Sequence, residues 1–563
     1  MRLFFNPSFK KNKNIDNFSN NVIIRRLFII SFFMTSIGLA VFTKIIEVAV
    51  VDDNKNGSTL YEITKEDNIL RGIIKDRNGR ILASNIFKYK LKAYPKLINN
   101  PVITAKLVKK EIHSLDEKRI IKQISNKSKY ETIIARNITA QQAKYINSLG
   151  IPGLEFFPSL KRFYPHNGLL SHIVGHTNNN LRGVNGIEKT FDKRLSVGED
   201  INLSIDIRIQ HASKEELIKD FLYYEAKSAT LIIADISKNE ILSMVSLPDF
   251  NPNLSINPKV KSYRNTATLN LYEMGSTFKV FSIAAALEHT GIDLKSNFDA
   301  SKPLQISRYT IRDYHPENRV LNTKEVFLKS SNIGASRMAL ELGGNNLKNF
   351  YRNLGLLDYS TINLNEKAKP KYPKKWGEIE TATLSYGHGI SITPIHLIEA
   401  ASLIFGDKKY KKVNLELQKN HKKINDKFLS LPTKDKLLHL MEENVLYGTG
   451  KNAFVKGYRI GGKTATAEKI NILEGGYDKR KLVSSFLAVF PIDKPRYISL
   501  VLFDEPILKQ RINSNDGATG GKTTAKTTAK VLKRIAPFLG LEEKDNINDI
   551  LVKKKKGINF ASF

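Results

Sequence analysis

Three short strings of residues carry side chains that could perform nucleophilic catalysis together. They are Ser276-Thr277-Phe278-Lys279, Ser330-Ser331-Asn332 and Lys463-Thr464-Ala465-Thr466. A serine hydroxyl is a poor nucleophile until an adjacent base removes its proton, and residues three apart share one face of a helix. A lysine can serve as that base only when burial and a nearby positive charge lower its pKa. The spacing therefore predicts that Lys279 can reach and activate Ser276, and Lys463 would supply the positive charge if the fold brings it close.

The surrounding sequence predicts the elements that must bring these strings together. From Ser276 the chain reads STFKVFSIAAALEH, which is apolar almost all round between Val280 and Leu287, as in a helix buried in a large core. An amphipathic closing helix is expected over 522–539. Two pairs of strands are expected, at 228–236 with 240–247 and at 484–490 with 496–503. Together these elements predict a mixed α/β sheet covered by helices.

The third string overlaps a pattern that has a different meaning in other proteins. Residues 457–464, GYRIGGKT, match G-x-x-x-x-G-K-[ST], the loop that holds nucleotide phosphates. Such a loop opens a helix, whereas the residues after Lys463 lack helical periodicity and break at Gly475-Gly476. We interpret them as a strand followed by a turn. The context therefore argues against a nucleotide site.

The composition excludes several classes of chemistry. The 563 residues contain no cysteine, which rules out disulfides, cysteine-ligated zinc and thiol catalysis. Lys and Arg number 89 against 55 Asp and Glu, a formal charge of +34. Such a surplus suits an anionic membrane surface or an anionic polymer, or it is simply spread over solvated faces. Because the basic residues are scattered and no RNA-binding signature occurs, we expect no nucleic-acid partner.

The N-terminal region predicts a membrane anchor. Residues 27–43, LFIISFFMTSIGLAVFT, carry no charge, and the run extends to Ile46 if the Lys44 amine reaches the interface. Six basic residues and one acid precede it, which places the N-terminus in the cytoplasm and the chain after residue 50 outside. A cleaved signal peptide is the alternative. The run is long for one and lacks a clear A-x-A exit, so we favour a retained, single-pass anchor.

In the order S-x-x-K, S-x-N and K-T, the three strings resemble the motifs of the penicillin-binding transpeptidases. The resemblance extends over nearly the whole chain beyond the anchor, and residues 385–394, SYGHGISITP, resemble the septal branch. Segments similar to the catalytic domain are 264–279, 313–340, 385–401, 448–453 and 491–506. Segments similar to the pedestal domain of class B members are 71–83 and 162–195.

The resemblance implies a role for each residue of the first two motifs. Ser276 would attack the carbonyl between the two terminal D-alanines of a stem pentapeptide, and Lys279 would be the general base. Ser330 would pass the proton to the leaving amine, while Asn332 would hold the substrate amide and Lys279. Lys463 would bond Ser330 and set the local charge. An amine from a neighbouring stem peptide would then close the cross-link.

The resemblance also implies how the third motif binds substrate. The hydroxyls of Thr464 and Thr466 would receive the terminal carboxylate, and the backbone N–H groups of Ser276 and Thr466 would form the oxyanion hole. The family's motif ends in glycine, whereas this chain has Ala465, from which we expect altered β-lactam affinity rather than lost activity. A rival K-T string, Gly521-Lys522-Thr523, lies on the expected closing helix and is discounted.

The resemblance implies an α/β fold: a penicillin-binding transpeptidase domain, similar to serine β-lactamases, with a mixed α+β pedestal and one transmembrane helix. The expected parts are a basic N-terminus at 1–26, the anchor at 27–46, the pedestal at 47–205, the transpeptidase domain at 206–541 and a basic tail at 542–563. The expected location is the bacterial inner membrane, with the catalytic domain in the periplasm.

The implied partners are stem pentapeptides, lipid-linked or on nascent glycan strands, and membrane proteins of the division machinery, including a lipid II polymerase. No cofactor is expected. We also expect no metal, because His166, His172 and His176 lack further ligands at suitable spacing. Two alternatives stay open. A β-lactamase would turn penicillin over rapidly, and a β-lactam sensor or degenerate scaffold would acylate without cross-linking.

Overall fold

The computed structural model of the chain describes residues 13–46, 70–254, 263–406, 413–417, 427–470, 476–508 and 517–543. The chain divides into two compact units, 1–70 and 71–563. The basic N-terminus expected at 1–26 is described only from residue 13. Most of the tail expected at 542–563 lies outside the described residues.

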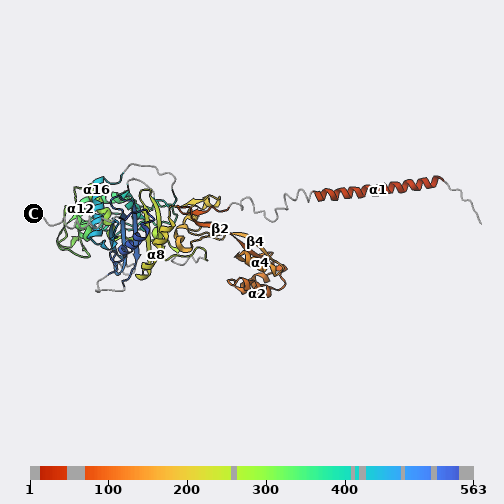
Figure 1. Cartoon of the computed structure of the whole chain (residues 1–563), viewed down its shortest axis with the longest axis horizontal. Coiled ribbons are helices and arrows are strands. Elements are labelled where there is room, and N and C mark those ends of the chain that lie inside the picture. Colours follow the sequence, from red (N-terminus) through yellow and green to blue (C-terminus); the bar gives the residue numbers. More distant parts are fainter. Residues whose placement is uncertain are drawn as a thin grey trace, which may run out of the picture. The chain divides into compact units, whose positions relative to one another are not determined.

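The first unit contains one long helix, α1 (Lys13–Ile46), which is labelled in Figure 1. It includes the uncharged run 27–43. The apolar side chains from Phe28 to Phe42 are exposed; Phe28, Phe32 and Leu39 show 74%, 71% and 67% of their surface. No helix among the described residues reaches the combined length and apolarity required of a membrane span.

The second unit begins with a small sheet built around one long strand. Strand β2 (Ile81–Ala93) pairs antiparallel with β1 (Ile74–Lys75), β3 (Thr132–Ile138) and β4 (Leu154–Phe163), and β1 pairs parallel with β5 (Ile201–Asn202). A tight turn with Gly79 at φ +81° joins β1 to β2. Helix α4 (Ala140–Ser148) packs on β4 and on α2 (Pro101–Glu111), and these elements are labelled in Figure 1. The remaining helices of this region are α3 (Glu117–Ser125), α5 (Ser171–Val174), α6 (Gly186–Thr190) and α7 (Asp192–Ser196).

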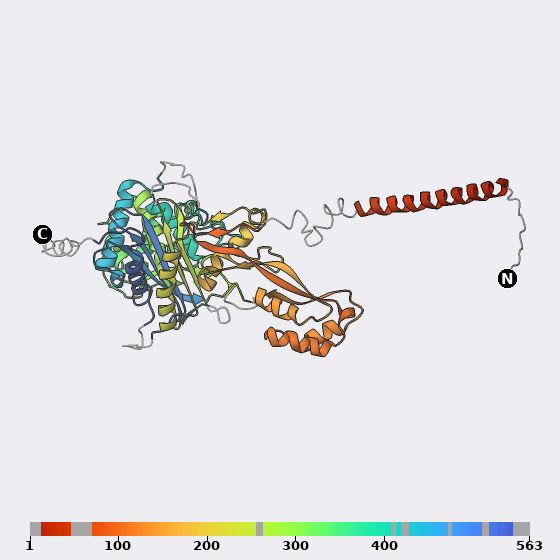
Figure 2. The ribbon, with the colours of Figure 1, turned by 45° about the vertical axis from the view of Figure 1, so that its right-hand side comes forward.

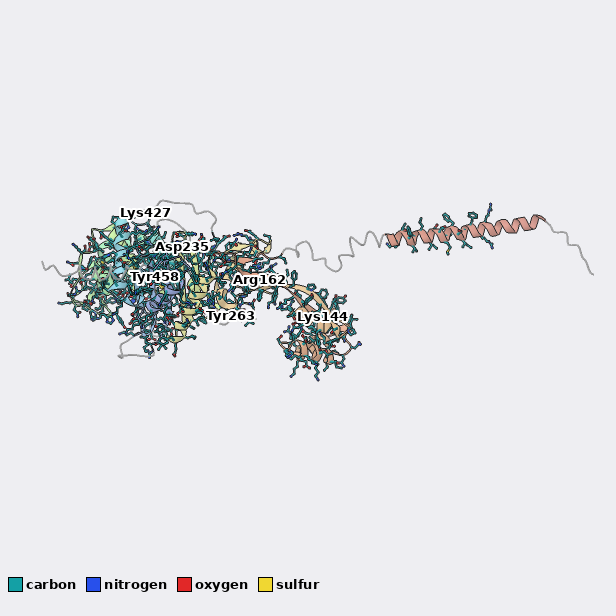
Figure 3. All side chains as sticks on the ribbon, in the orientation of Figure 1. Lys144, Arg162, Asp235, Tyr263, Lys427 and Tyr458 are labelled. Atoms are coloured by element: carbon teal, nitrogen blue, oxygen red, sulfur yellow. The ribbon has the colours of Figure 1, made fainter. Side chains whose placement is uncertain are left out.

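A buried ion cluster ties this region together. The Glu188 carboxylate of α6 lies between two arginines, with Arg71 Nε 2.7 Å from Oε2 and Arg162 Nε 2.7 Å from Oε1. Glu188 is fully buried, and both guanidinium groups are almost completely so. Arg162, at the end of β4, is labelled in Figure 3. Because each partner neutralises a charge that burial would otherwise penalise, the cluster depends on all three residues.

The central sheet of the chain has five antiparallel strands in the order β14-β15-β16-β6-β7. The strands are β6 (Ser228–Asp235), β7 (Glu240–Leu247), β14 (Gly461–Ile470), β15 (Tyr477–Phe490) and β16 (Tyr497–Asp504). In Figure 2 the blue strands from the end of the chain lie beside the yellow strands β6 and β7. Both predicted strand pairs are confirmed, although β15 begins seven residues earlier than expected.

Helices cover both faces of this sheet, because the strands are apolar on both sides. Along β6, Ile232 and Ala234 belong to the core that contains α10 (Lys279–His289) and α15 (Pro394–Phe405). The alternate residues Leu231 and Ile233 belong to the core that contains α8 (Ile207–Tyr223) and α17 (Thr524–Ile535). The structure is therefore a mixed α/β fold in which helices cover both faces of the central sheet, and it confirms the predicted mixed α/β sheet covered by helices.

The closing helix differs from its expected bounds. Helix α17 begins at Thr524 rather than at 522, so Lys522 and Thr523 lie in the turn before it. The cause is the close approach of Gly520, where a Cβ atom would lie 2.5 Å from the Ala465 carbonyl oxygen of β14. The helix therefore begins only after the chain has left this close contact with β14.

The remaining elements surround the catalytic region. The strands are β8 (Tyr272–Glu273), β9 (Asn297–Asp299), β10 (Leu304–Ile306), β11 (Tyr309–Ile311), β12 (Val320–Asn322) and β13 (Ser391–Ile392). The helices are α9 (Thr266–Leu269), α11 (Thr323–Lys329), α12 (Asn332–Leu342), α13 (Gly344–Asn353), α14 (Glu378–Leu384) and α16 (Leu431–Leu446).

Candidate active site

The first predicted motif lies where a 3-10 turn, η5 (Gly275–Phe278), runs into helix α10. The sequence placed Ser276 and Lys279 on one α-helix, whereas the structure places Ser276 in the turn and Lys279 at the first residue of α10. Side chains three residues apart eclipse in a 3-10 turn, so the expected meeting is kept. Lys279 Nζ lies 3.1 Å from Ser276 Oγ.

Lys279 is completely buried and makes several further polar contacts. Its Nζ atom lies 2.8 Å from Asn332 Oδ1, 2.5 Å from the Ser330 carbonyl oxygen and 3.3 Å from Ser330 Oγ. The amine also lies 6.0 Å from the centre of the Tyr386 ring. The structure therefore brings the first two predicted motifs into direct contact around one amine.

Ser330 lies between two lysines. It ends helix α11 in the left-handed conformation, with φ 60° and ψ 39°. Lys463 Nζ, from β14, donates to Ser330 Oγ at 2.8 Å, and Lys279 approaches the same oxygen from the other side. A left-handed serine is uncommon, and this backbone turn aims the hydroxyl into the gap between the two amines.

The electrostatics of this pair favour a neutral amine. Burial lowers the pKa of Lys279 well below its usual range, the charge on Lys463 lowers it further, and Asp313 acts in the opposite direction. Burial also lowers the pKa of Lys463 to about 7. The sequence predicted both causes for Lys279. A buried lysine whose amine is neutral can accept a proton from a serine hydroxyl.

Asp313 holds the second motif in place, and the sequence assigned it no role. Its Oδ2 accepts from Ser331 Oγ at 2.7 Å, and its Oδ1 accepts from the backbone N–H groups of Asn332 and Ile333 at 2.5 and 3.0 Å. Ser331 in turn caps helix α12 through the Gly334 N–H group. These N–H groups would otherwise lack partners at the helix start, so Asp313 fixes the turn that presents Ser330 and Asn332.

The third motif lies on edge strand β14, which contradicts a phosphate-binding loop and supports the strand interpretation. Strand alternation puts Lys463 and Ala465 on one face and Thr464 and Thr466 on the other. The Thr464 hydroxyl lies 2.6 Å from Thr449 Oγ1, and Thr466 Oγ1 accepts from the Gly520 N–H group at 3.1 Å.

Ala465, the departure from the family motif, is nearly completely buried. Its face of β14 packs against the nucleophile turn, where a Cβ atom on Gly275 would lie 3.3 Å from Ala467 Cβ. The methyl group of Ala465 therefore shares the face of the nucleophile and of Lys463.

Sequence reasoning also missed a group of three residues near Lys279, namely Glu273, His388 and Tyr477. Glu273 is nearly buried, and its Oε1 accepts from the Gly389 N–H group at 3.0 Å and from the Tyr477 hydroxyl at 3.3 Å. The His388 ring stacks on Tyr477 with centroids 5.1 Å apart. Burial raises the pKa of Glu273, and burial followed by the Lys279 charge lowers the pKa of His388 to about 4.

The three histidines considered as ligands lie between β4 and α6. His172 and His176 pack edge-on against the Phe250 ring, and His166 Nε2 lies 3.1 Å from the Ile81 carbonyl oxygen. Within the described ranges, no group of three or more His, Asp or Glu residues is arranged to hold a metal ion.

The chain matches two protein-family models and is similar to known proteins over most of its length. A family model described as the penicillin binding protein transpeptidase domain matches residues 229–533, and one described as the penicillin-binding protein dimerisation domain matches 67–202. The chain is 34% identical to the probable peptidoglycan D,D-transpeptidase FtsI of Caulobacter vibrioides, over 85% of this chain and 82% of that protein.

Two further relatives are similar over most of their length. The chain is 29% identical to the peptidoglycan D,D-transpeptidase FtsI of Escherichia coli K12, over 77% of this chain and 79% of that protein. It is also 29% identical to the stage V sporulation protein D of Bacillus subtilis, over 84% and 79% respectively.

Proposed function

The chain belongs to the class B penicillin-binding proteins of the septal type, and from this premise we propose that it is a peptidoglycan D,D-transpeptidase that acts through an acyl-enzyme on Ser276. One observation carries the assignment: a fully buried lysine, Lys279, contacts the Ser276 hydroxyl at 3.1 Å and the second motif at the same time. The family resemblance and the printed names of the relatives support the same reaction.

Acylation begins when Ser276 Oγ attacks the carbonyl carbon of the penultimate D-alanine. The hydroxyl proton passes to Lys279 Nζ, whose neutral form is favoured by burial. As the C–N bond breaks, the proton moves through the Ser330 hydroxyl to the leaving nitrogen, and free D-alanine departs. Ser330 suits this relay because both lysine amines lie within 3.3 Å of its oxygen.

Deacylation repeats these steps with a new nucleophile. A primary amine from a neighbouring stem peptide attacks the ester carbonyl and gives a proton to Lys279. The ester C–O bond breaks, Ser276 Oγ regains a proton, and the new amide is the cross-link. Asn332, which contacts Lys279 through Oδ1, holds the substrate amide in both steps.

The substrate peptide lies along the free edge of β14. An extended peptide can add to such an edge through backbone hydrogen bonds, and β14 ends the five-stranded sheet. The Thr464 and Thr466 hydroxyls receive the terminal carboxylate. The backbone N–H groups of Ser276 and Thr466 stabilise the oxyanion, a contribution typically worth about 3 kcal/mol per donor.

The proposed location is the bacterial inner membrane, with α1 as a single-pass anchor and the catalytic domain in the periplasm. The uncharged run 27–43 and the exposed apolar side chains of α1 support the anchor. The pedestal would span 47–205 and the transpeptidase domain 206–541. The proposed partners are division membrane proteins, including a lipid II polymerase. Extraction of membranes at alkaline pH tests the anchor, and release of the full chain into the supernatant would refute it.

Labelling with a fluorescent penicillin tests the catalytic assignment. Wild-type protein should carry one stable label, and Ser276→Ala should carry none. Ser282→Ala is the matched control, because Ser282 carries a buried hydroxyl on α10, the helix that follows the Ser276 turn, and donates to the Ser385 carbonyl oxygen at 2.7 Å. This control should keep the label. A label that persists on Ser276→Ala would overturn the nucleophile assignment, and rapid release of hydrolysed penicillin would favour a β-lactamase.

A further inference from the structure

The segment Gly448-Thr449-Gly450 is wrapped tightly around one buried side chain, and the reaction derived above gives it no part. Asn444, on α16, is completely buried. Its Oδ1 accepts from the Thr449 N–H group at 3.1 Å and from the Thr449 hydroxyl at 3.2 Å. A Cβ atom at Gly448 would lie 2.3 Å from Asn444 Oδ1, and one at Gly450 would lie 3.0 Å from Asn444 Nδ2. Glycines on both sides therefore allow Thr449 to meet the amide.

The hydrogen bonds of Asn444 settle which way its amide faces. Nδ2 donates to the Gly462 carbonyl oxygen at 2.7 Å, at the start of the catalytic strand β14. Oδ1 faces the Thr449 N–H group, which can only donate. Asn444 thus joins the 448–450 segment to β14 and presents an acceptor to the Thr449 hydroxyl.

Beyond Asn444, Thr449 contacts the strand residue proposed to bind substrate. Its Oγ1 lies 2.6 Å from Thr464 Oγ1. Each hydroxyl has a single proton to donate. When Thr449 donates to Asn444, Thr464 must donate to Thr449, and its proton then points away from an incoming carboxylate.

A bound carboxylate reverses this chain of donors. Thr464 can donate to the carboxylate only if its own oxygen accepts from Thr449. Asn444 Oδ1 tolerates the change because it keeps the Thr449 N–H group as a partner. Thr466 needs no such reversal, because its oxygen already accepts from the Gly520 N–H group and its proton stays free.

We propose that Thr449 is a positioning residue that orients the Thr464 hydroxyl as a donor and thereby strengthens binding of ligands with a terminal carboxylate. The inference rests on the proposed function of the same site. It adds a third hydroxyl to the site, that of Thr449, which is an exposed residue in contact with the edge strand β14 through Thr464. Hydroxyls linked in this way polarise one another, so removal of the outer one weakens the inner one as a donor.

The test compares Thr449→Val, which keeps the branched shape but loses the hydroxyl, with Thr449→Ser, which keeps it. The measurement is the second-order rate of acylation by benzylpenicillin and by its uncharged methyl ester. Thr449→Val should slow acylation by the acid about 5- to 10-fold. The reason is that it removes the hydrogen bond from the Thr449 hydroxyl to Thr464, which strengthens Thr464 as a donor to the charged carboxylate. The same substitution should slow acylation by the ester less than about twofold, and Thr449→Ser should restore the rate with the acid.

A second pair of variants separates positioning from a general effect on folding. In a Thr464→Val background, Thr449→Val should have no further effect on the rate with the acid, because the hydroxyl that it orients is gone. Equal slowing with acid and ester, or full additivity with Thr464→Val, would overturn the inference. If wild-type protein were not acylated by penicillin at all, the proposed function itself would fail, so the two failures are distinguishable.

Discussion

Replacing Lys463 by methionine should move the pH dependence of acylation upward. The rate of acylation rises with pH as Lys279 loses its proton and becomes a base. The positive charge on Lys463 is one of the causes that keep the pKa of Lys279 low. Lys463→Met removes this charge at similar side-chain volume, so Lys279 keeps its proton to a higher pH. The midpoint of the acidic limb of the pH–rate profile should therefore move to a higher pH.

The geometry sets the size of this displacement. Both amines lie within hydrogen-bond distance of Ser330 Oγ, at 3.3 and 2.8 Å, so their nitrogens are at most about 6 Å apart. Two unit charges at about 6 Å repel by about 3 kcal/mol at an effective dielectric constant of about 20, which is equivalent to about two pH units. Because burial lowers the pKa of Lys463 to about 7, the residue is only partly charged near neutrality, and we expect a displacement of about one to two pH units.

The assay is the second-order rate of acylation by a fluorescent penicillin between about pH 5 and pH 10, which extends from near the usual lysine pKa to several units below it. Ser330→Ala is the matched control, since it removes the shared hydroxyl and leaves both amines. It should lower the maximal rate by about 100-fold or more while the midpoint of the acidic limb stays in place. A midpoint that is unchanged or lower in Lys463→Met would refute the electrostatic role of Lys463.

Three other substitutions test separate parts of the structure. Gly387→Ala should lower acylation at least about tenfold, because its Cβ would lie 2.4 Å from the Gly275 carbonyl oxygen next to the nucleophile; Gly389→Ala, with nearly the same positive φ but only ordinary contacts, should keep most of the rate. Glu188→Gln should lower the free energy of unfolding by about 3 kcal/mol or more in denaturant melts, since it leaves the buried Arg162 without a carboxylate partner and Arg71 with Asp192 alone; an unchanged midpoint would contradict this. Ala465→Gly should cost about 1 kcal/mol of stability and change penicillin acylation by a few-fold without abolishing it, and complete loss of labelling would show that the methyl group is required.

The predictable parts of the site are those that depend on residues close together in the sequence. The three-residue spacing of Ser276 and Lys279 and the alternation of β14 each depend on a few neighbouring residues. The structure confirms the Ser276–Lys279 contact, although through a 3-10 turn rather than one α-helix, and it confirms the strand. The four strands of the two predicted pairs pair with one another because they are apolar on both faces. The family resemblance then supplied their chemical meaning, which spacing alone does not give.

The parts that were not predictable depend on contacts between distant segments. Asp313 caps a helix that begins nineteen residues later, and Glu273 meets Tyr477 across 204 positions of the sequence. Thr449 reaches Thr464 only because two glycines wrap the chain around Asn444. No local period marks such pairs, because residues so far apart in the sequence meet only through the folded arrangement of the chain. The start of α17 was misplaced for the same reason, since Gly520 meets a strand more than fifty residues away.

The central claim is that Ser276 carries a peptidyl ester that an amine converts into a cross-link. The most direct measurement is mass spectrometry of the full chain and its products after incubation with a stem pentapeptide and an acceptor peptide with a free side-chain amine. The account predicts a stem tetrapeptide bound to Ser276, with one D-alanine released for each cross-linked dimer formed. It predicts none of these products for Ser276→Ala. Cross-linked dimer formed by Ser276→Ala, or a wild-type adduct on another residue, would contradict the account.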